Sequence, residues 1–163
     1  MVSDSERKTA YNASVSLFRY IGDYMNTIAD KYGLEEAFET QKKLSIRLGR
    51  ESAGKVKRNP NGVEFTPKFA ADYYVDGNRR LGVDTSAEIH GDIVHLLMRE
   101  CPIYDGLKAA GFSDAMVERF CVNNTVYRTQ YTLEGYRNDA LFEIVKFRDK
   151  RDDPCLKQVS IHK

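Results

Sequence analysis

The chain has 163 residues and a mass of 18.7 kDa, and its apolar share of 42% is enough for one domain with a hydrophobic core. Its 25 basic and 24 acidic residues nearly cancel, which argues against nucleic-acid and anionic-membrane partners. The sequence has no apolar signal core, no 18-residue apolar run and an odd number of cysteines. We therefore expect a cytoplasmic protein with free thiols.

Two long helices are predicted at the start of the chain. From about Asp4 to Lys31, apolar and aromatic residues recur every three or four positions, and Tyr32-Gly33 ends the pattern. A second helix is predicted from Leu34 to Leu48, and the short connection favours an antiparallel pair. The aromatic stripe of the first helix is expected to pack on the core; a ligand pocket or a homodimer face are the alternatives.

The segment from Gly49 to Lys55 has the glycine and lysine spacing of a phosphate-binding P-loop. Val56 stands where that motif needs a Ser or Thr hydroxyl, and a helix precedes the segment where a strand is required. Nucleotide binding is therefore not expected. The chain from Lys57 to Gly62 is predicted to be a basic, turn-rich surface loop.

A third helix is predicted from Pro67 to about Arg80, because Thr66 can cap it and proline is favoured at the first helical position. Tyr73 and Tyr74 lie on its apolar side. They are candidate substrate contacts, since they can present hydroxyls to a small molecule from an apolar wall. Packing in the core is the alternative.

A central strand is predicted from Glu88 to Glu100. Alternate residues of a strand share a face, so His90 and His95 are expected on opposite faces. His95, Arg99 and Cys101 are expected on the same face. His95 is therefore a further candidate substrate contact.

Cys101 is expected at the start of a short helix, because Pro102 follows it and suits the first helical turn. Unpaired N–H groups at a helix start favour the thiolate. Arg99, its neighbour on the strand face, could hold a ligand carboxylate. The alternatives are a cysteine that fills an apolar gap and an arginine at a solvated strand end.

The remaining elements are a helix, a hairpin and a tail. Ser113 is predicted to cap a helix whose shared face carries Val117, Phe120, Cys121 and Asn124. Residues 129–134 and 139–148 are predicted to form a hairpin around Gly135, antiparallel to the central strand. Residues 149–163 are predicted to be a loosely held polar tail with an accessible Cys155.

A set of motifs in the second half of the chain resembles a known family. The motifs are Arg99-Glu100-Cys101-Pro102, a short helix ending at Gly111-Phe112, Glu118-Arg119-Phe120-Cys121-Val122-Asn123-Asn124, Tyr131-Thr132-Leu133-Glu134-Gly135 and Leu141-Phe142-Glu143-Ile144. In order and spacing they resemble the L-2-amino-thiazoline-4-carboxylic acid hydrolase-like family. The family pattern has an aspartate where Asn124 stands and a third cysteine near Asp139 or Ala140.

The resemblance implies hydrolytic opening of a carboxylate-bearing cyclic amidine or thiazoline, in which water attacks an sp² carbon. It makes Cys101, Cys121 and Asn124 the candidate catalytic residues, with Arg99 as the carboxylate anchor. An amide such as Asn124 can orient water but cannot accept a proton as an aspartate does. The alternative is a non-catalytic small-molecule-binding or sensory domain, whose architecture is similar to that of 4-vinyl reductase-type domains.

The sequence therefore predicts a single α+β domain over residues 1–163. Its N-terminal helices, in residues 1–80, pack with a small antiparallel sheet and its connecting helices in residues 81–148. No metal or other cofactor is expected, because no compact ligand pair occurs among His90, His95, Cys101, Cys121 and His162. The expected partner is a small organic acid, and a homodimer through the first helix is a further expectation.

Two expectations concern the site directly. The helix start at Cys101, the face from Cys121 to Asn124 and the hairpin are expected to meet at one cavity. Cys101 is expected to be the more reactive thiol, because desolvation of Cys121 on an apolar face disfavours its thiolate.

Overall fold

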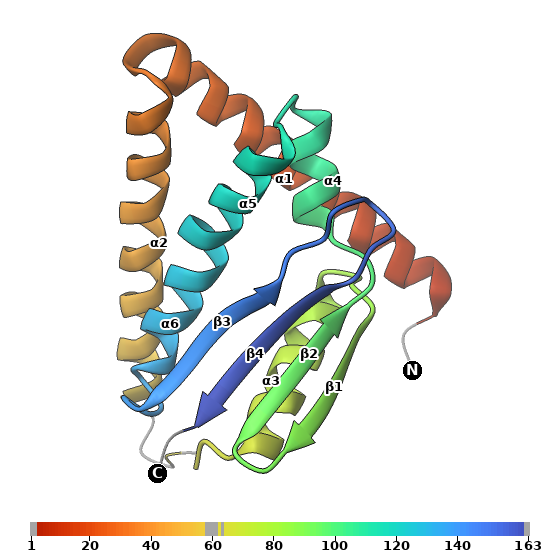
Figure 1. The fold of residues 1–163 in the computed structure, drawn as a ribbon, viewed down its shortest axis with the longest axis vertical. Coiled ribbons are helices and arrows are strands. Elements are labelled where there is room, and N and C mark those ends of the chain that lie inside the picture. Colours follow the sequence, from red (N-terminus) through yellow and green to blue (C-terminus); the bar gives the residue numbers. More distant parts are fainter. Residues whose placement is uncertain (1–2, 58–61, 63, 162–163) are drawn as a thin grey trace.

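Helices packed on one antiparallel sheet make up the computed structural model, which describes residues 3–57, 62 and 64–161 (Figure 1). The helices are α1 (Asp4–Tyr32), α2 (Leu34–Lys57), α3 (Pro67–Arg80), α4 (Pro102–Ala109), α5 (Asp114–Cys121) and α6 (Tyr127–Leu133), with a π-helical segment η1 (Val122–Val126) between α5 and α6. The strands, in sheet order, are β1 (Thr85–His90), β2 (Ile93–Met98), β4 (Cys155–Ile161) and β3 (Ala140–Lys146). The predicted α+β class is confirmed.

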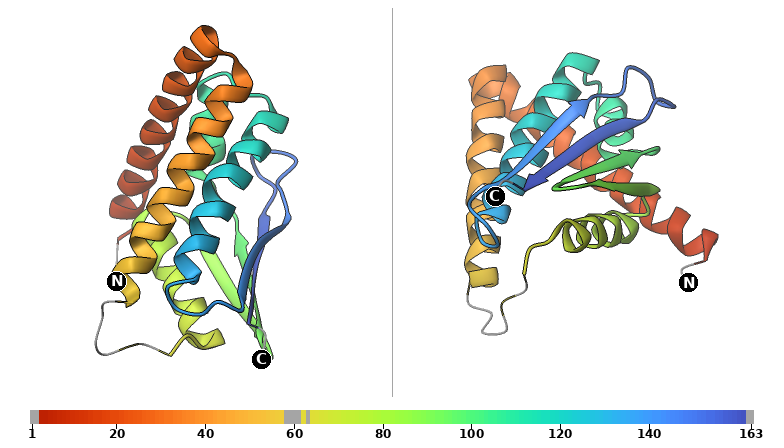
Figure 2. Two further views of the ribbon diagram at one scale, coloured as in Figure 1. Left: turned by 90° about the vertical axis from the view of Figure 1, so that its left-hand side faces the viewer. Right: turned by 60° about the horizontal axis from the view of Figure 1, so that its bottom comes forward.

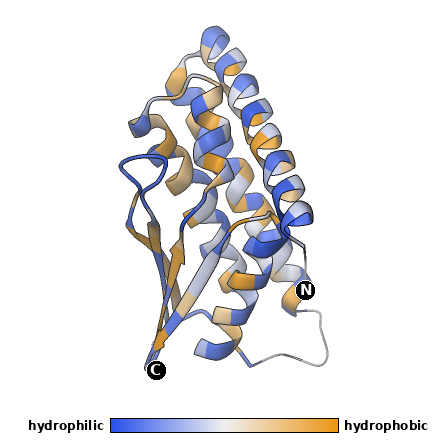
Figure 3. Cartoon of the chain, turned by 90° about the vertical axis from the view of Figure 1, so that its right-hand side faces the viewer, coloured by the Kyte–Doolittle hydropathy of each residue, from blue (hydrophilic) through white to orange (hydrophobic). Residues whose placement is uncertain are grey.

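The described helices all lie on one side of the sheet (Figure 2). Helix α3 packs on β1 and β2, and α6 packs on β3. The inward-facing side chains of the strands are buried in the core beneath these helices; they include Val94, Leu96, Phe142, Val159 and Ile161. The helices show alternating hydrophilic and hydrophobic residues along their lengths, as expected for helices that bury one side (Figure 3).

Helices α1 and α2 form a V, and the continuous ribbon of α5, η1 and α6 runs alongside α2 (Figure 1). Ser3 and Glu6 form a capping box at the start of α1, and Gly33, at φ 92°, lets the chain turn into α2. Both predicted helices are confirmed. Helices α1 and α4 pack closely at Gly106, which has no side chain. A Cβ at this position would lie only 2.6 Å from the carbonyl oxygen of Val15.

Helix α2 is longer than predicted and continues from Leu48 to Lys57. The P-loop-like segment is therefore helical, and its first glycine has a packing role. A Cβ on Gly49 would lie 2.7 Å from the Arg128 carbonyl oxygen, so only glycine allows α6 to approach this closely. The prediction of a surface loop is wrong at Lys57; residues 58–61 lie outside the described part of the chain.

The predicted single strand from Glu88 to Glu100 is wrong. Gly91 has a φ of 62°, and the chain turns there, so β1 and β2 form a hairpin with a two-residue connection. Glu88 pairs with His95 in this hairpin. His90 and His95 therefore share a face, with ring centroids 5.3 Å apart, and are not on opposite faces.

The predicted hairpin around Gly135 is wrong in its first strand, because residues 129–133 belong to helix α6, whereas its second strand is found as β3. The side chain of Gln130 reaches the edge strand instead. Its Oε1 accepts from the Phe142 N–H at 2.9 Å, and its Nε2 donates to the Ala140 carbonyl at 2.9 Å. Beta-branched and aromatic residues favoured a strand here, but packing against α2 selects a helix.

The predicted polar tail, residues 149–163, contains the strand β4, which lies between β2 and β3. Val94 pairs with Val159, and Phe142 pairs with the same residue from the other side. The strand signal is an alternation in which Cys155, Lys157, Val159 and Ile161 face the helices. Because one of these inward-facing residues is Lys157, the segment has a polar composition and was not recognised as a strand.

Candidate functional site

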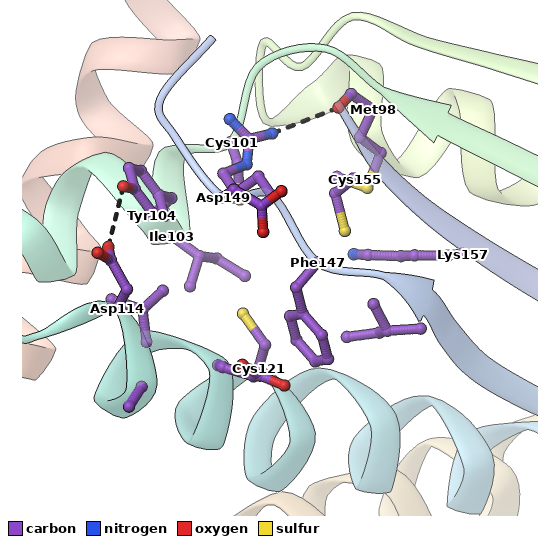
Figure 4. A pocket seen from close by; sticks show the side chains of 15 residues that line it. Met98, Cys101, Ile103, Tyr104, Asp114, Cys121, Phe147, Asp149, Cys155 and Lys157 are labelled. Atoms are coloured by element: carbon purple, nitrogen blue, oxygen red, sulfur yellow. Dashed lines mark hydrogen bonds between the residues drawn. The ribbon is translucent and has the colours of Figure 1, made fainter. Parts of the chain in front are cut away.

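A cavity of about 250 Å³ lies between α4, α5 and the sheet, and all three cysteines line it (Figure 4). We call it the cysteine cavity. Two basic residues, Arg148 and Lys157, line it as well. Its apolar wall includes Met98, Ile103, Val117, Ile144 and Phe147, and its exposed acidic residues are Asp114, Glu118 and Asp149.

Cys101 stands at the start of α4, as predicted. Its backbone is extended, Pro102 occupies the first helical turn, and the Cys101 side chain makes no capping hydrogen bond. The thiol is buried and lines the cavity. A buried thiol beside the free N–H groups of a helix start is well placed to act on a bound molecule.

Cys121 is the last residue of α5 and lies across the cavity from Cys101 (Figure 4). Burial raises the pKa of the Cys121 thiol, and a negative charge on Cys101 acts in the same direction. The positive charge of Lys157 opposes both effects. Cys121 is half-buried, and its expected meeting with Cys101 at one cavity is confirmed.

Cys155, the first residue of β4, is buried in the same cavity. The prediction that it is accessible in a loose tail is wrong, because β4 pairs on both sides and places Cys155 opposite Met98. Burial raises the pKa of Cys155, against the opposing charge of Lys157. Cys155 therefore belongs to the site and cannot serve as an exposed control.

Lys157 is the least expected residue of the cavity. Its side chain is only 8% exposed, and it extends from the middle of β4 into the cavity, past Cys155 and Phe147 (Figure 4). Among residues 3–57, 62 and 64–161, no carboxylate pairs with its ammonium group and no acceptor bonds to it. Lysines this deeply buried normally have a partner, because an unpaired charge loses its hydration.

Arg148 lines the same cavity as Lys157 but is already engaged. Its guanidinium donates to the carbonyl oxygens of Arg151 at 2.7 Å and Met98 at 3.3 Å, and it stacks over the ring of Tyr104. These contacts hold the loop between β3 and β4 against the end of β2. Arg148 thus shapes the wall, whereas the ammonium group of Lys157 makes no hydrogen bond within the described part of the chain.

Asp114 is the acidic residue of the mouth with defined partners. Its carboxylate accepts from the Tyr104 hydroxyl at 3.0 Å and pairs with Lys108 at 3.1 Å. The hydrogen bond from Lys108, and then that from Tyr104, lower the pKa of Asp114. The negative charge of Asp114 at the cavity opening is therefore balanced by the positive charge of Lys108.

Asn124, a predicted catalytic residue, does not line the cysteine cavity. Its Oδ1 accepts from the Ser45 hydroxyl at 3.2 Å, so it faces α2. Asn124 lies in η1, and a π-helical turn holds more residues than an α-helical turn. Alpha-helical spacing predicted that Cys121 and Asn124 share a face. In the structure Cys121 faces the cysteine cavity and Asn124 faces α2.

The predicted substrate contacts also lie elsewhere. Arg99 is exposed and pairs with Asp84 at 3.4 Å, and the His95 ring bonds to Gln158 at 3.0 Å on the uncovered sheet face. Tyr73 and Tyr74 belong to an aromatic cluster on α3, where burial raises the pKa of Tyr74 well above its ordinary value. None of these predicted contacts reaches the cysteine cavity.

The residues that the sequence analysis missed are Lys157, Arg148 and Cys155. The signal for Cys155 and Lys157 was the alternation of inward-facing residues along β4, which brings both side chains to the same side of the strand. Arg148 carries no such signal, because it follows β3 in an irregular connection.

Comparisons with known proteins add no relative: no protein-family model, curated protein or solved structure matches this chain. In the described ranges, no helix is both long and apolar enough to cross a bilayer. The same ranges hold no group of three or more His, Cys, Asp or Glu residues that could bind a metal ion. Function is therefore inferred from the chemistry of the cysteine cavity.

Proposed function

We propose that the protein binds a small, carboxylate-bearing organic molecule in the cysteine cavity, with Lys157 as the anchor of the carboxylate. The observation that carries this proposal is the ammonium group of Lys157, which lines the cavity and makes no ion pair or hydrogen bond within the described part of the chain. A ligand carboxylate would supply the missing charge and accept charge-assisted hydrogen bonds. The role first assigned to Arg99 passes to Lys157, because Arg99 is exposed and paired with Asp84.

The rest of the cavity fits the body of such a ligand. Apolar side chains such as Ile103, Val117 and Phe147 line its wall, and its volume of about 250 Å³ suits a small ring compound. The three thiols are soft and polarisable and favour contact with sulfur or with an unsaturated ring. A thiazoline carboxylate has these properties, which is the substrate class that the family resemblance implies.

Hydrolysis is the second candidate function, and the position of Cys101 favours it. The reaction adds water to the sp² ring carbon: the carbon gains oxygen, the ring C–N bond breaks, and the nitrogen leaves with a proton. Cys101 at the start of α4 is the candidate nucleophile for a two-step route: its sulfur bonds to the ring carbon as the C–N bond breaks and the nitrogen is protonated, and water then displaces the Cys101 sulfur from that carbon and returns the thiol. Asn124 cannot take part from its place against α2, so Glu118 or Asp149 at the mouth would be the base.

The binding proposal is tested with a matched pair of ligands, 2-amino-2-thiazoline-4-carboxylate and 2-amino-2-thiazoline, by calorimetric titration. The carboxylate compound should bind, and the compound without the carboxylate should bind about tenfold more weakly or not at all. Lys157→Met should abolish this difference. Lys146→Met, at an exposed position of β3, is the control and should preserve it.

Equal binding of the two compounds to the wild-type protein, or an equal loss in both variants, would overturn the assignment of Lys157. Hydrolysis is tested separately by following ring opening by NMR. A hydrolase should open the ring in the wild-type protein and lose this activity in Cys101→Ser while still binding the ligand. Binding without any ring opening would leave the non-catalytic function.

A further inference from the structure

A second cavity, of about 280 Å³, lies between α1 and α2. Phe120 and Asn124 line it, whereas Cys121 faces the cysteine cavity, so the two cavities lie on opposite sides of the ribbon formed by α5, η1 and α6. We call it the interhelical cavity. Its wall is mostly apolar and includes Leu17, Ile21, Tyr24, Met25, Ile28 and Leu44.

Gln41 places an unsatisfied acceptor in this apolar wall. The side chain is 8% exposed and lines the cavity, and its Oε1 atom is buried without a hydrogen-bond partner in the described part of the chain. A buried amide oxygen normally has a donor, because leaving it unpaired costs its hydration without return. A bound molecule with an O–H or N–H group would supply that donor.

The hydrogen bonds around Gln41 hold its amide in place. Its Nε2 donates to the Ser45 hydroxyl at 2.8 Å, and that hydroxyl lies 3.2 Å from Oδ1 of Asn124 in η1. Asn123, the preceding residue of η1, donates to the Phe38 carbonyl at 3.2 Å. The π-helical segment thus connects to α2 at two points, and such segments occur frequently at functional sites.

The charge of the wall restricts the ligand further. No acidic residue lines the cavity, and Arg128 is its only charged residue in the described chain. An ammonium donor would meet no counter-charge here and would lie near a guanidinium. The donor that suits Gln41 is therefore a neutral hydroxyl or amide.

From these observations we infer that the interhelical cavity is a second binding site, for a neutral and largely apolar small molecule whose hydroxyl or amide N–H donates to Oε1 of Gln41. The apolar body of the ligand packs between the aromatic and aliphatic side chains of α1 and α2. This site is independent of the cysteine cavity and needs neither its thiols nor Lys157.

Two naphthalenes test the inference: 2-naphthol carries the donor, and 2-methoxynaphthalene has nearly the same body without it. Calorimetric titration should give an affinity about five- to tenfold higher for 2-naphthol. Gln41→Met keeps the length of the side chain and removes the acceptor, so it should abolish the preference. Gln158→Met, on the uncovered sheet face, should leave the preference unchanged.

Methionine methyl groups locate the site without any substitution. In protein labelled with ¹³C at these methyls, 2-naphthol should shift the signal of Met25, which lines the interhelical cavity. It should not shift Met98, which lines the cysteine cavity. Equal affinities for the two compounds, no binding of either, or a shift at Met98 in place of Met25 would overturn the inference, whatever the stability of Gln41→Met.

Discussion

Lys157 and Cys155 lie two residues apart on β4, so their side chains leave the strand on the same side and enter the same cavity. Burial raises the pKa of the Cys155 thiol, and the ammonium of Lys157 acts against that rise. The same charge acts on Cys121 across the cavity. The charge of Lys157 therefore influences two thiols, one on a strand and one on a helix.

Removing that cation should make both thiols less reactive. In Lys157→Met the pKa values of Cys155 and Cys121 should rise further, because the positive charge of Arg148 alone then opposes the effect of burial. Alkylation by iodoacetamide, measured by peptide mass spectrometry between pH 7 and 9, should slow at both cysteines. Lys146→Met should leave both rates at the wild-type value, and unchanged rates in Lys157→Met would contradict the prediction.

Cys101 should be the most reactive of the three thiols. It lies beside the free N–H groups of α4, whereas burial raises the pKa of both Cys121 and Cys155. With a limiting amount of iodoacetamide, Cys101 should be modified first and should remain the leading site as the pH is lowered. Free glutathione is the exposed reference in place of Cys155. Faster modification of Cys121 at every pH would identify Cys101 as a core thiol.

Local signals in the sequence were sufficient to predict several elements and one part of the site. Thr66-Pro67 and Ser113 are found as helix starts, and Cys101-Pro102 begins α4 as expected. Each of these signals depends on the chemistry of one or two adjacent residues. The meeting of Cys101 and Cys121 was predicted because both lie in the family-like motifs of the second half of the chain, and the structure places both at the cysteine cavity.

The remaining parts depend on contacts between distant segments, which local patterns do not encode. Strand β4 pairs with β2, more than fifty residues earlier, and its inward-facing Lys157 makes it appear polar. Asn124 was assigned to the wrong face because η1 departs from α-helical spacing. The turn at Gly91 had a visible glycine, but the flanking apolar residues favoured one continuous strand.

Gly106 should be indispensable for the packing of α1 on α4. A Cβ at this position would lie 2.6 Å from the Val15 carbonyl oxygen and 2.7 Å from Cβ of Phe18, so the two helices would have to separate. Gly106→Ala should lower the free energy of unfolding by about 1–3 kcal/mol, the usual cost of overpacking. Urea denaturation followed by circular dichroism measures this change.

Gly77→Ala is the matched control for that substitution. Gly77 lies in α3, and a Cβ there would have nothing within 4 Å. Alanine should raise the free energy of unfolding by about 0.5–1 kcal/mol, because it restricts the unfolded chain and favours a helix. Equal effects of the two substitutions would show that close packing at Gly106 is unimportant.

Tyr74 should make the fold sensitive to alkali. Burial raises its pKa well above 10, so the folded protein disfavours the phenolate that the unfolded chain forms at about pH 10. The stabilising contribution is complete below pH 10 and is lost as the pH rises above it. Tyr74→Phe removes the ionising group and keeps the ring that packs on Phe142. Its free energy of unfolding should therefore fall less between pH 9 and 11.5 than that of the wild-type protein.

Tyr20→Phe, at a residue that is 70% exposed, is the control and should follow the wild-type curve. A Tyr74→Phe curve parallel to the wild-type and Tyr20→Phe curves would refute the assignment.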